Sequence, residues 1–170
     1  ESDGADAYVS FDNAQGGALM AEVLEPAIDD LGLDHPANVV MLNGGPTDDN
    51  ARLFRDGYSA TVEERVAAGD WNLVADEPVP DWDNAQAGVI MEQILTDANN
   101  EVDAVFAAND GLAGAAITAM QAAGLDTQNI PTSGQDATVP GIQLILSGDQ
   151  TMTVYKPITE ETAASAEAAI

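Results

Sequence analysis

Short apolar runs alternate with longer segments of helical periodicity along the whole chain. Between Gly17 and Leu33, apolar residues recur at spacings of three and four, as the buried face of one helix requires. The pattern predicts helices at Ala14–Leu31, Asp49–Ala68, Asn84–Asn99, Gly111–Ala123, Val139–Gly148 and from Thr159 onward. It predicts strands at Tyr8–Phe11, Val39–Leu42, Trp71–Ala75, Ala104–Ala107, Asn129–Thr132 and Met152–Tyr155.

Strands that alternate with helices over short connections indicate a parallel sheet covered by helices on both faces. The predicted fold class is therefore α/β, a doubly wound parallel sheet. A strand opens the chain without a helix before it, and residues 160–170 have the composition of an unfinished helix. We interpret this as one lobe of a two-lobed protein; a trimmed single domain is the alternative.

The charge balance excludes several classes of partner. The 170 residues carry 30 acidic and 4 basic side chains, a net charge of −26. Nucleic acid and anionic membrane surfaces need Lys and Arg, so neither is expected as a partner. The acids are spread singly and in pairs, which is typical of a halophilic surface that molar salt screens. An acidic patch for a basic partner is the alternative.

Polar residues gather in the loops that follow the predicted strands, where ligands bind in doubly wound sheets. Asp48, Asn50 and Arg52 follow the strand at Val39–Leu42. Thr47 or Asp48 can cap the next helix. Arg52 opposes the dipole at a helix start, so it has either a specific partner or a salt bridge to a nearby Asp.

Trp82 follows the third predicted strand in the acidic, proline-containing loop 78–84. Its indole offers a flat apolar face for a sugar ring, or it folds back on the domain. Trp71, inside a strand, is assigned to packing. Asn109 and Asp110 follow the fourth strand; one is expected to cap the next helix and the other to face the ligand.

Asp136 follows the fifth predicted strand, and Lys156 is the single lysine of the chain. A lysine retained in so acidic a chain is expected to have a specific partner. Together the loop residues supply carboxylates, amides, cations and an indole. This inventory suits a neutral polyhydroxyl ligand, since carboxylates accept from hydroxyls and cations donate to them.

Five segments carry a family resemblance: residues 8–13, 50–57, 109–110, 133–137 and 150–158. The strings Gly-Gln-Asp-Ala and Thr-Met-Thr-Val-Tyr-Lys-Pro are the specific ones. In order and over nearly the whole chain, these segments resemble the D-xylose-binding proteins of ABC transporters. That family belongs to the type I periplasmic sugar-binding proteins.

The resemblance implies that residues 1–157 form the C-terminal sugar-binding lobe, with hinge strands near 8–13 and 150–157. Residues 158–170 would begin a helix that returns to the missing N-terminal lobe. The implied sugar-contacting residues are Asp48, Asn50, Trp82, Asn109, Asp136 and Lys156, with Arg52 as a second-tier candidate. The implied protein is extracytoplasmic, periplasmic or extracellular, and could be anchored through an upstream segment. It binds D-xylose or a similar monosaccharide and docks on an ABC permease.

Two other functions are alternatives to this one. The ligand-sensing domain of a sugar-responsive transcription regulator shares the lobe fold, but no basic DNA-binding segment is visible. An enzyme is not expected, because the sequence holds no nucleophile elbow, Walker loop or zinc-protease motif. His35, before Pro36, is assigned to a surface loop. No cofactor or metal is expected.

Overall fold

The centre of the sheet is β1, Ala37–Asn43, in the computed structural model, which describes residues 8–169. Val39 and Met41 point into one core cluster and Val40 and Leu42 into another. Because both faces of β1 are buried, its sequence is a continuous apolar run. The strands β2, Trp71–Pro78, and β3, Ala104–Ala107, pair with it in parallel, in the order β2-β1-β3.

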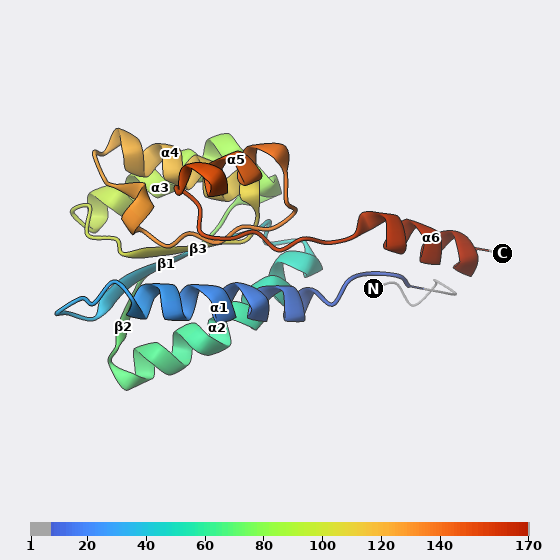
Figure 1. Cartoon of the computed structure of the whole chain (residues 1–170), viewed down its shortest axis with the longest axis horizontal. Coiled ribbons are helices and arrows are strands. Elements are labelled where there is room, and N and C mark those ends of the chain that lie inside the picture. The colour runs from blue at the N-terminus through green and yellow to red at the C-terminus, as the bar shows by residue number, and fades with distance from the viewer. Residues whose placement is uncertain (1–7, 170) are drawn as a thin grey trace.

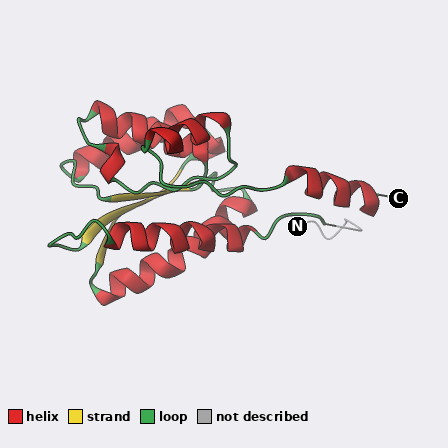
Figure 2. Ribbon diagram, in the orientation of Figure 1, coloured by secondary structure: helices red, strands yellow, loops and turns green. Residues whose placement is uncertain are grey.

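Helices cover both faces of this sheet, as the sequence predicts (Figure 1). α1, Asn13–Asp29, and α2, Asp49–Ala68, pack on one face. α3, Asn84–Asp97, and α4, Asp110–Ala122, pack on the other, and α5, Val139–Ser147, lies against α4. Figure 2 shows the strands as a thin layer between the two layers of helices. The predicted fold class is confirmed.

Three predicted strands are wrong in whole or in part. Tyr8–Phe11 is irregular and pairs with no strand among the described residues. Residues 127–129 form a short 3-10 helix, η2, and Thr132 makes a single parallel bridge to Val105. In Met152–Tyr155, Val154 makes a single bridge to Gln135.

Two of these segments fail to form regular strands because β3 is short and the segments beside it make few backbone hydrogen bonds. The Val105 N–H donates to the Pro131 carbonyl at 2.9 Å, and Ser133 N–H returns to Val105 at 3.0 Å. Pro131 itself has no N–H to donate, so this pairing does not extend into a ladder. The two segments therefore continue the sheet without forming regular strands.

Glycines bring α1 and α2 into direct backbone contact. A Cβ on Gly17 would lie 2.1 Å from the Phe54 carbonyl oxygen, and one on Gly57 would lie 2.2 Å from that of Ala14. Only glycine fits at such a crossing. The contact sets the N-termini of the two helices side by side at the end of the sheet where β1 finishes.

The last helix, α6, Ile158–Ala168, buries none of its side chains and extends away from the sheet (Figure 1). Residues 1–7 and 170, which belong to the predicted lobe and to the predicted last helix, lie outside the described residues. Among the described helices, none has the length and apolar composition needed to cross a bilayer.

Candidate functional site

One hollow of about 290 Å³ lies at the carboxyl ends of the strands. Its wall comes from loops far apart in the sequence, after β1, β2 and β3 and around the bridges at Gln135 and Val154. Six of the seven residues predicted to contact sugar line it: Asp48, Asn50, Trp82, Asn109, Asp136 and Lys156. We call it the cavity below.

Asp48 and Trp82 form a hydrogen-bonded pair in the wall. Asp48 is the N-cap of α2 and accepts from the Asn50 N–H at 2.9 Å through Oδ1. Its Oδ2 accepts from the indole Nε1 of Trp82 at 3.0 Å. A Cβ on Gly44 would lie 2.1 Å from the indole, so a glycine is required beneath the ring. The orientation of Trp82 is thus set from both sides.

Asp136 and Lys156 form the charged pair of the cavity. The Lys156 ammonium lies 3.1 Å from Oδ1 of Asp136 and 5.1 Å from the centroid of the Phe54 ring. Lys156 keeps further N–H groups, and the second carboxylate oxygen of Asp136 remains as an acceptor. Neighbouring hydroxyls of one ligand can therefore meet a donor and an acceptor side by side.

Asn109, not Asp110, is the residue of its pair that lines the cavity. Asn109 caps α4 by accepting from the Leu112 N–H at 2.9 Å, which leaves its Nδ2 group as a donor. Asp110 is buried and accepts from Gln150 at 2.9 Å and from the backbone of Thr138 at 2.8 Å. Asn109 therefore both caps α4 and lines the cavity, so the expectation that these two residues divide the roles of cap and exposed polar group is wrong.

Arg52 lies outside the cavity. Its guanidinium pairs with Asp49 at 2.8 Å and with Asp56 at 2.7 Å on the exposed surface of α2. The salt bridge that the sequence left open as an alternative is thus present. The structure brings Arg52 instead to a separate hollow beside the Gly44-Gly45-Pro46 turn.

The sequence analysis missed the apolar floor of the cavity and the residues from the chain segments at its rim. Phe54 meets the Trp82 ring edge-on at 6.4 Å between centroids. Its position on a buried helix face gave no sign of this role. The further lining residues are Ser10, Phe11, Asn13, Gln135, Ile158 and Glu161. Only Gln135, beside Asp136 in a specific string, carried a signal that could have found it.

A partly buried hydrogen-bond network holds the loop after β1. The carboxylate of Asp76 accepts from Asn43 at 2.7 Å and from Nε of Arg55 at 3.1 Å, and the Tyr58 hydroxyl donates to Asn43. Partial burial alone would raise the pKa of Asp76, but the Arg55 and Asn43 hydrogen bonds outweigh burial and lower it. Burial raises the pKa of Tyr58, which keeps its hydroxyl as a donor. The network anchors the turn that presents Asp48.

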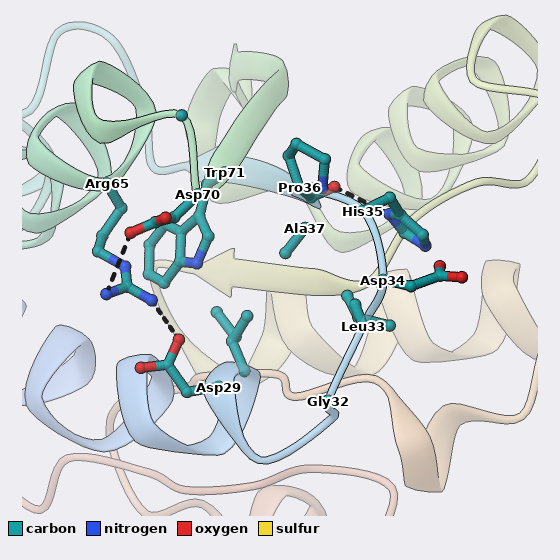
Figure 3. A pocket seen from close by; sticks show the side chains of 12 residues that line it. Asp29, Gly32, Leu33, Asp34, His35, Pro36, Ala37, Arg65, Asp70 and Trp71 are labelled. Atoms are coloured by element: carbon teal, nitrogen blue, oxygen red, sulfur yellow. Dashed lines mark hydrogen bonds and ion pairs between the residues drawn. The ribbon is translucent and has the colours of Figure 1, made fainter.

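A larger hollow, of about 610 Å³, lies at the opposite end of the sheet (Figure 3). There Arg65 pairs with Asp29 and with Asp70 at 3.4 Å, and its guanidinium lies 5.4 Å from the centroid of Trp71. Trp71 is buried, as its assignment to packing predicts. Arg65, on α2, thereby links the end of α1 to the residue before β2.

Within residues 8–169, no cluster of three or more His, Asp or Glu side chains is arranged to hold a metal ion. The residues of the cavity are instead hydrogen-bonding groups around an aromatic floor. A model of the periplasmic binding protein domain matches the chain over residues 1–170. The chain belongs to the periplasmic binding protein family.

Relatives in this family include sugar binders. The chain is 42% identical over 165 residues to the D-xylose-binding periplasmic proteins of Haemophilus influenzae and of Escherichia coli, covering 97% of this chain and 48% of each relative. A solved periplasmic solute-binding protein of an ABC transporter from Actinobacillus succinogenes, with bound D-allose, is 31% identical. It has a TM-score of 0.77 over 94% of this chain and 53% of its own.

The chain spans about half the length of the curated relatives it matches. The resemblance on which the sequence analysis relied is therefore confirmed at the level of the family.

Proposed function

We propose that this chain is the C-terminal, sugar-gripping lobe of the extracytoplasmic binding component of an ABC importer, and that D-xylose or a similar monosaccharide is its ligand. One observation carries the proposal: six residues from separate loops, singled out as sugar contacts, line one cavity. The proposal assigns the chain a binding role and no catalytic one.

The polar groups of the cavity suit a neutral polyhydroxyl ligand. Asp48 and Asp136 supply acceptors, and Asn50, Asn109 and Lys156 supply donors. The three cavity carboxylates, of Asp48, Asp136 and Glu161, and the one ammonium leave no excess of cations for an anionic ligand. Charge-assisted hydrogen bonds to hydroxyls are the strong contacts in such a site.

Trp82 supplies the apolar contact. Its indole lines the cavity while its Nε1 is held by Asp48, so the ring is oriented before a ligand arrives. A pyranose ring carries C–H groups on its face, and an aromatic ring covers that face. A ring fixed in advance loses little entropy on binding, which favours affinity.

The second face of the sugar would be covered by an N-terminal lobe. In this mechanism the ligand binds between open lobes, and segments 8–13 and 150–157 act as hinges during closure. Closure is driven only by contacts that exist in the closed state. The closed form would then dock on the permease outside the cytoplasmic membrane.

Calorimetric titration of D-xylose, D-glucose and D-ribose in molar KCl tests the proposal, on this chain and on a two-lobed form. Asp136→Asn should weaken sugar binding about tenfold or more, because it replaces a charge-assisted hydrogen bond. The matched control is Asp49→Asn, which removes the same charge from an exposed side chain outside the cavity and should leave affinity unchanged.

Saturable binding that Asp136→Asn weakens and Asp49→Asn does not would support the site and the ligand class together. Absence of saturable binding of all three sugars by both forms would contradict the proposed ligand. Binding only by the two-lobed form would show that the second lobe is required.

A further inference from the structure

Asn50 reaches the cavity from α2 with its amide oxygen already engaged. Its Oδ1 accepts from Nδ2 of Asn13 at 2.7 Å. Asn13, the first residue of α1, also lines the cavity but is only 5% exposed. The bond turns the oxygen of Asn50 toward Asn13, which leaves the Nδ2 group of this amide free to donate to a ligand.

The backbone around this pair gives the two amides a defined separation. Gly17 and Gly57 set the crossing of α1 and α2 at backbone contact. Asp12 caps α1 through the Gln15 N–H at 2.9 Å, and Asp48 caps α2 beside Asn50. The two asparagines therefore lie at adjoining, capped helix N-termini. The distance between them is fixed by the crossing of α1 and α2.

We propose that Asn13 is a positioning residue for the ligand site, fixing the amide of Asn50 so that its Nδ2 donor is the end offered to the cavity. The inference deepens the proposed function and rests on it, because the donor is set for an oxygen lone pair of a sugar hydroxyl or ring. Asn13 touches no ligand in this scheme and acts only through Asn50.

A fixed donor at Asn50 places a hydrogen-bond donor beside the carboxylate acceptors of the cavity. Asp48 and Asp136 can only accept from a ligand hydroxyl, whereas Lys156 can only donate. One ligand hydroxyl can donate its hydrogen to the Asp48 carboxylate. The oxygen of the same hydroxyl can accept from Nδ2 of Asn50. A freely rotating amide would instead present either end, and it would lose rotational freedom on binding.

Two substitutions that add the same charge test the direction of the Asn13–Asn50 bond without any sugar. In Asn50→Asp the new carboxylate still accepts from Asn13, so the bond survives. In Asn13→Asp the donor is lost, and with the Asn50 amide in its present orientation two acceptors face each other. Each new carboxylate lies at a helix N-terminus near a capping aspartate, so the variants are matched in charge and helix position, although position 13 is the more deeply buried of the two.

In thermal unfolding at a fixed molar KCl concentration, we expect Asn13→Asp to lower Tm about 2–6 °C further than Asn50→Asp does. An equal or larger loss in Asn50→Asp would overturn the proposal, since it would mean that Asn50 is the donor to Asn13.

The second measurement is a double-mutant cycle on D-xylose affinity, using Asn13→Asp with and without Asn50→Ala. We expect Asn13→Asp to raise Kd about tenfold in the unaltered protein and less than twofold in the Asn50→Ala background. A purely structural role would cost the same in both backgrounds, and that result would overturn the proposal. So would an unchanged Kd for Asn13→Asp alone.

The two measurements separate this inference from the proposed function. Failure of the unaltered protein to bind any of the sugars contradicts the proposed ligand. The Tm comparison still decides whether Asn13 orients Asn50, because it needs no ligand.

Discussion

Trp82 holds a backbone conformation that tryptophan rarely adopts. Its φ is 57°, and Asp136, on the other side of the cavity, has a φ of 97°. Bulky residues in this region cost free energy and persist where the surroundings determine them, often at ligand sites. Here the Asp48 hydrogen bond and the close approach of Gly44 hold Trp82 in place. The local strain supports the sequence-based choice of Trp82 as a ligand contact.

Replacing Trp82 by Ala should weaken sugar binding of the two-lobed form by about 1–3 kcal/mol, because a large apolar contact is lost. Calorimetric titration with D-xylose measures the change. Trp82→Phe is the control: it keeps an aromatic face and loses the hydrogen bond to Asp48, so its effect should be smaller. Unchanged affinity in Trp82→Ala would remove Trp82 from the site.

At the scale of elements, the helices followed from the sequence more closely than the strands. α2 begins and ends where the pattern predicts, and the other predicted helices differ from the observed ones by one or two residues at their ends. Helix ends depend on local signals such as the Asp48 cap and the Gly69 C-cap. Whether the segments around Thr132 and Val154 form strands depends on pairing with a neighbouring strand. Such pairing joins residues far apart in the sequence, so the local pattern does not predict it.

The close crossing of α1 and α2 predicts that a glycine at the crossing tolerates substitution less well than a mid-helix glycine elsewhere. Gly57→Ala should destabilise the protein by about 1–3 kcal/mol or more, because its Cβ would collide with the backbone of α1. Gly88→Ala, in α3, meets nothing within 4 Å and should stabilise by about 0.5–1 kcal/mol through helix propensity.

Thermal unfolding of both variants in the same molar KCl buffer measures the difference. At this chain length each kcal/mol corresponds to about 2–4 °C in Tm. Equal Tm values for the two variants would show that α1 and α2 tolerate a wider separation than the structure indicates.

At the scale of the whole molecule, few ion pairs offset the net negative charge. All four cations pair with carboxylates: Arg52, Arg55, Arg65 and Lys156. Four cations cannot offset 30 acidic residues, so most of the negative charge is uncompensated. The Debye length, over which salt screens charges from one another, shortens from about 10 Å at 0.1 M salt to about 3 Å at 1 M. The fold should accordingly depend on salt.

We expect Tm to rise steadily between 0.1 M and 2 M KCl, as screening relieves repulsion among the carboxylates. A variant with exposed glutamates changed to Gln is the control and should show a flatter dependence; suitable positions are Glu22, Glu63, Glu92 and Glu167. Scanning calorimetry across the salt series measures both. A Tm independent of salt would contradict the interpretation of the charge as a halophilic surface.

The sequence by itself determined the helices, the α/β class and six of the residues that line the cavity. The helices and the fold class follow from periodicity and capping, which are local properties, whereas the six residues are those that the family resemblance implies. Only the tertiary structure decided that Asn109 both caps and lines the cavity, that Arg52 turns to Asp49 and Asp56, and that Asn13 meets Asn50. The physical reason is that hydrogen-bond partners far apart in sequence are chosen by helix crossing and sheet order, which no local pattern encodes.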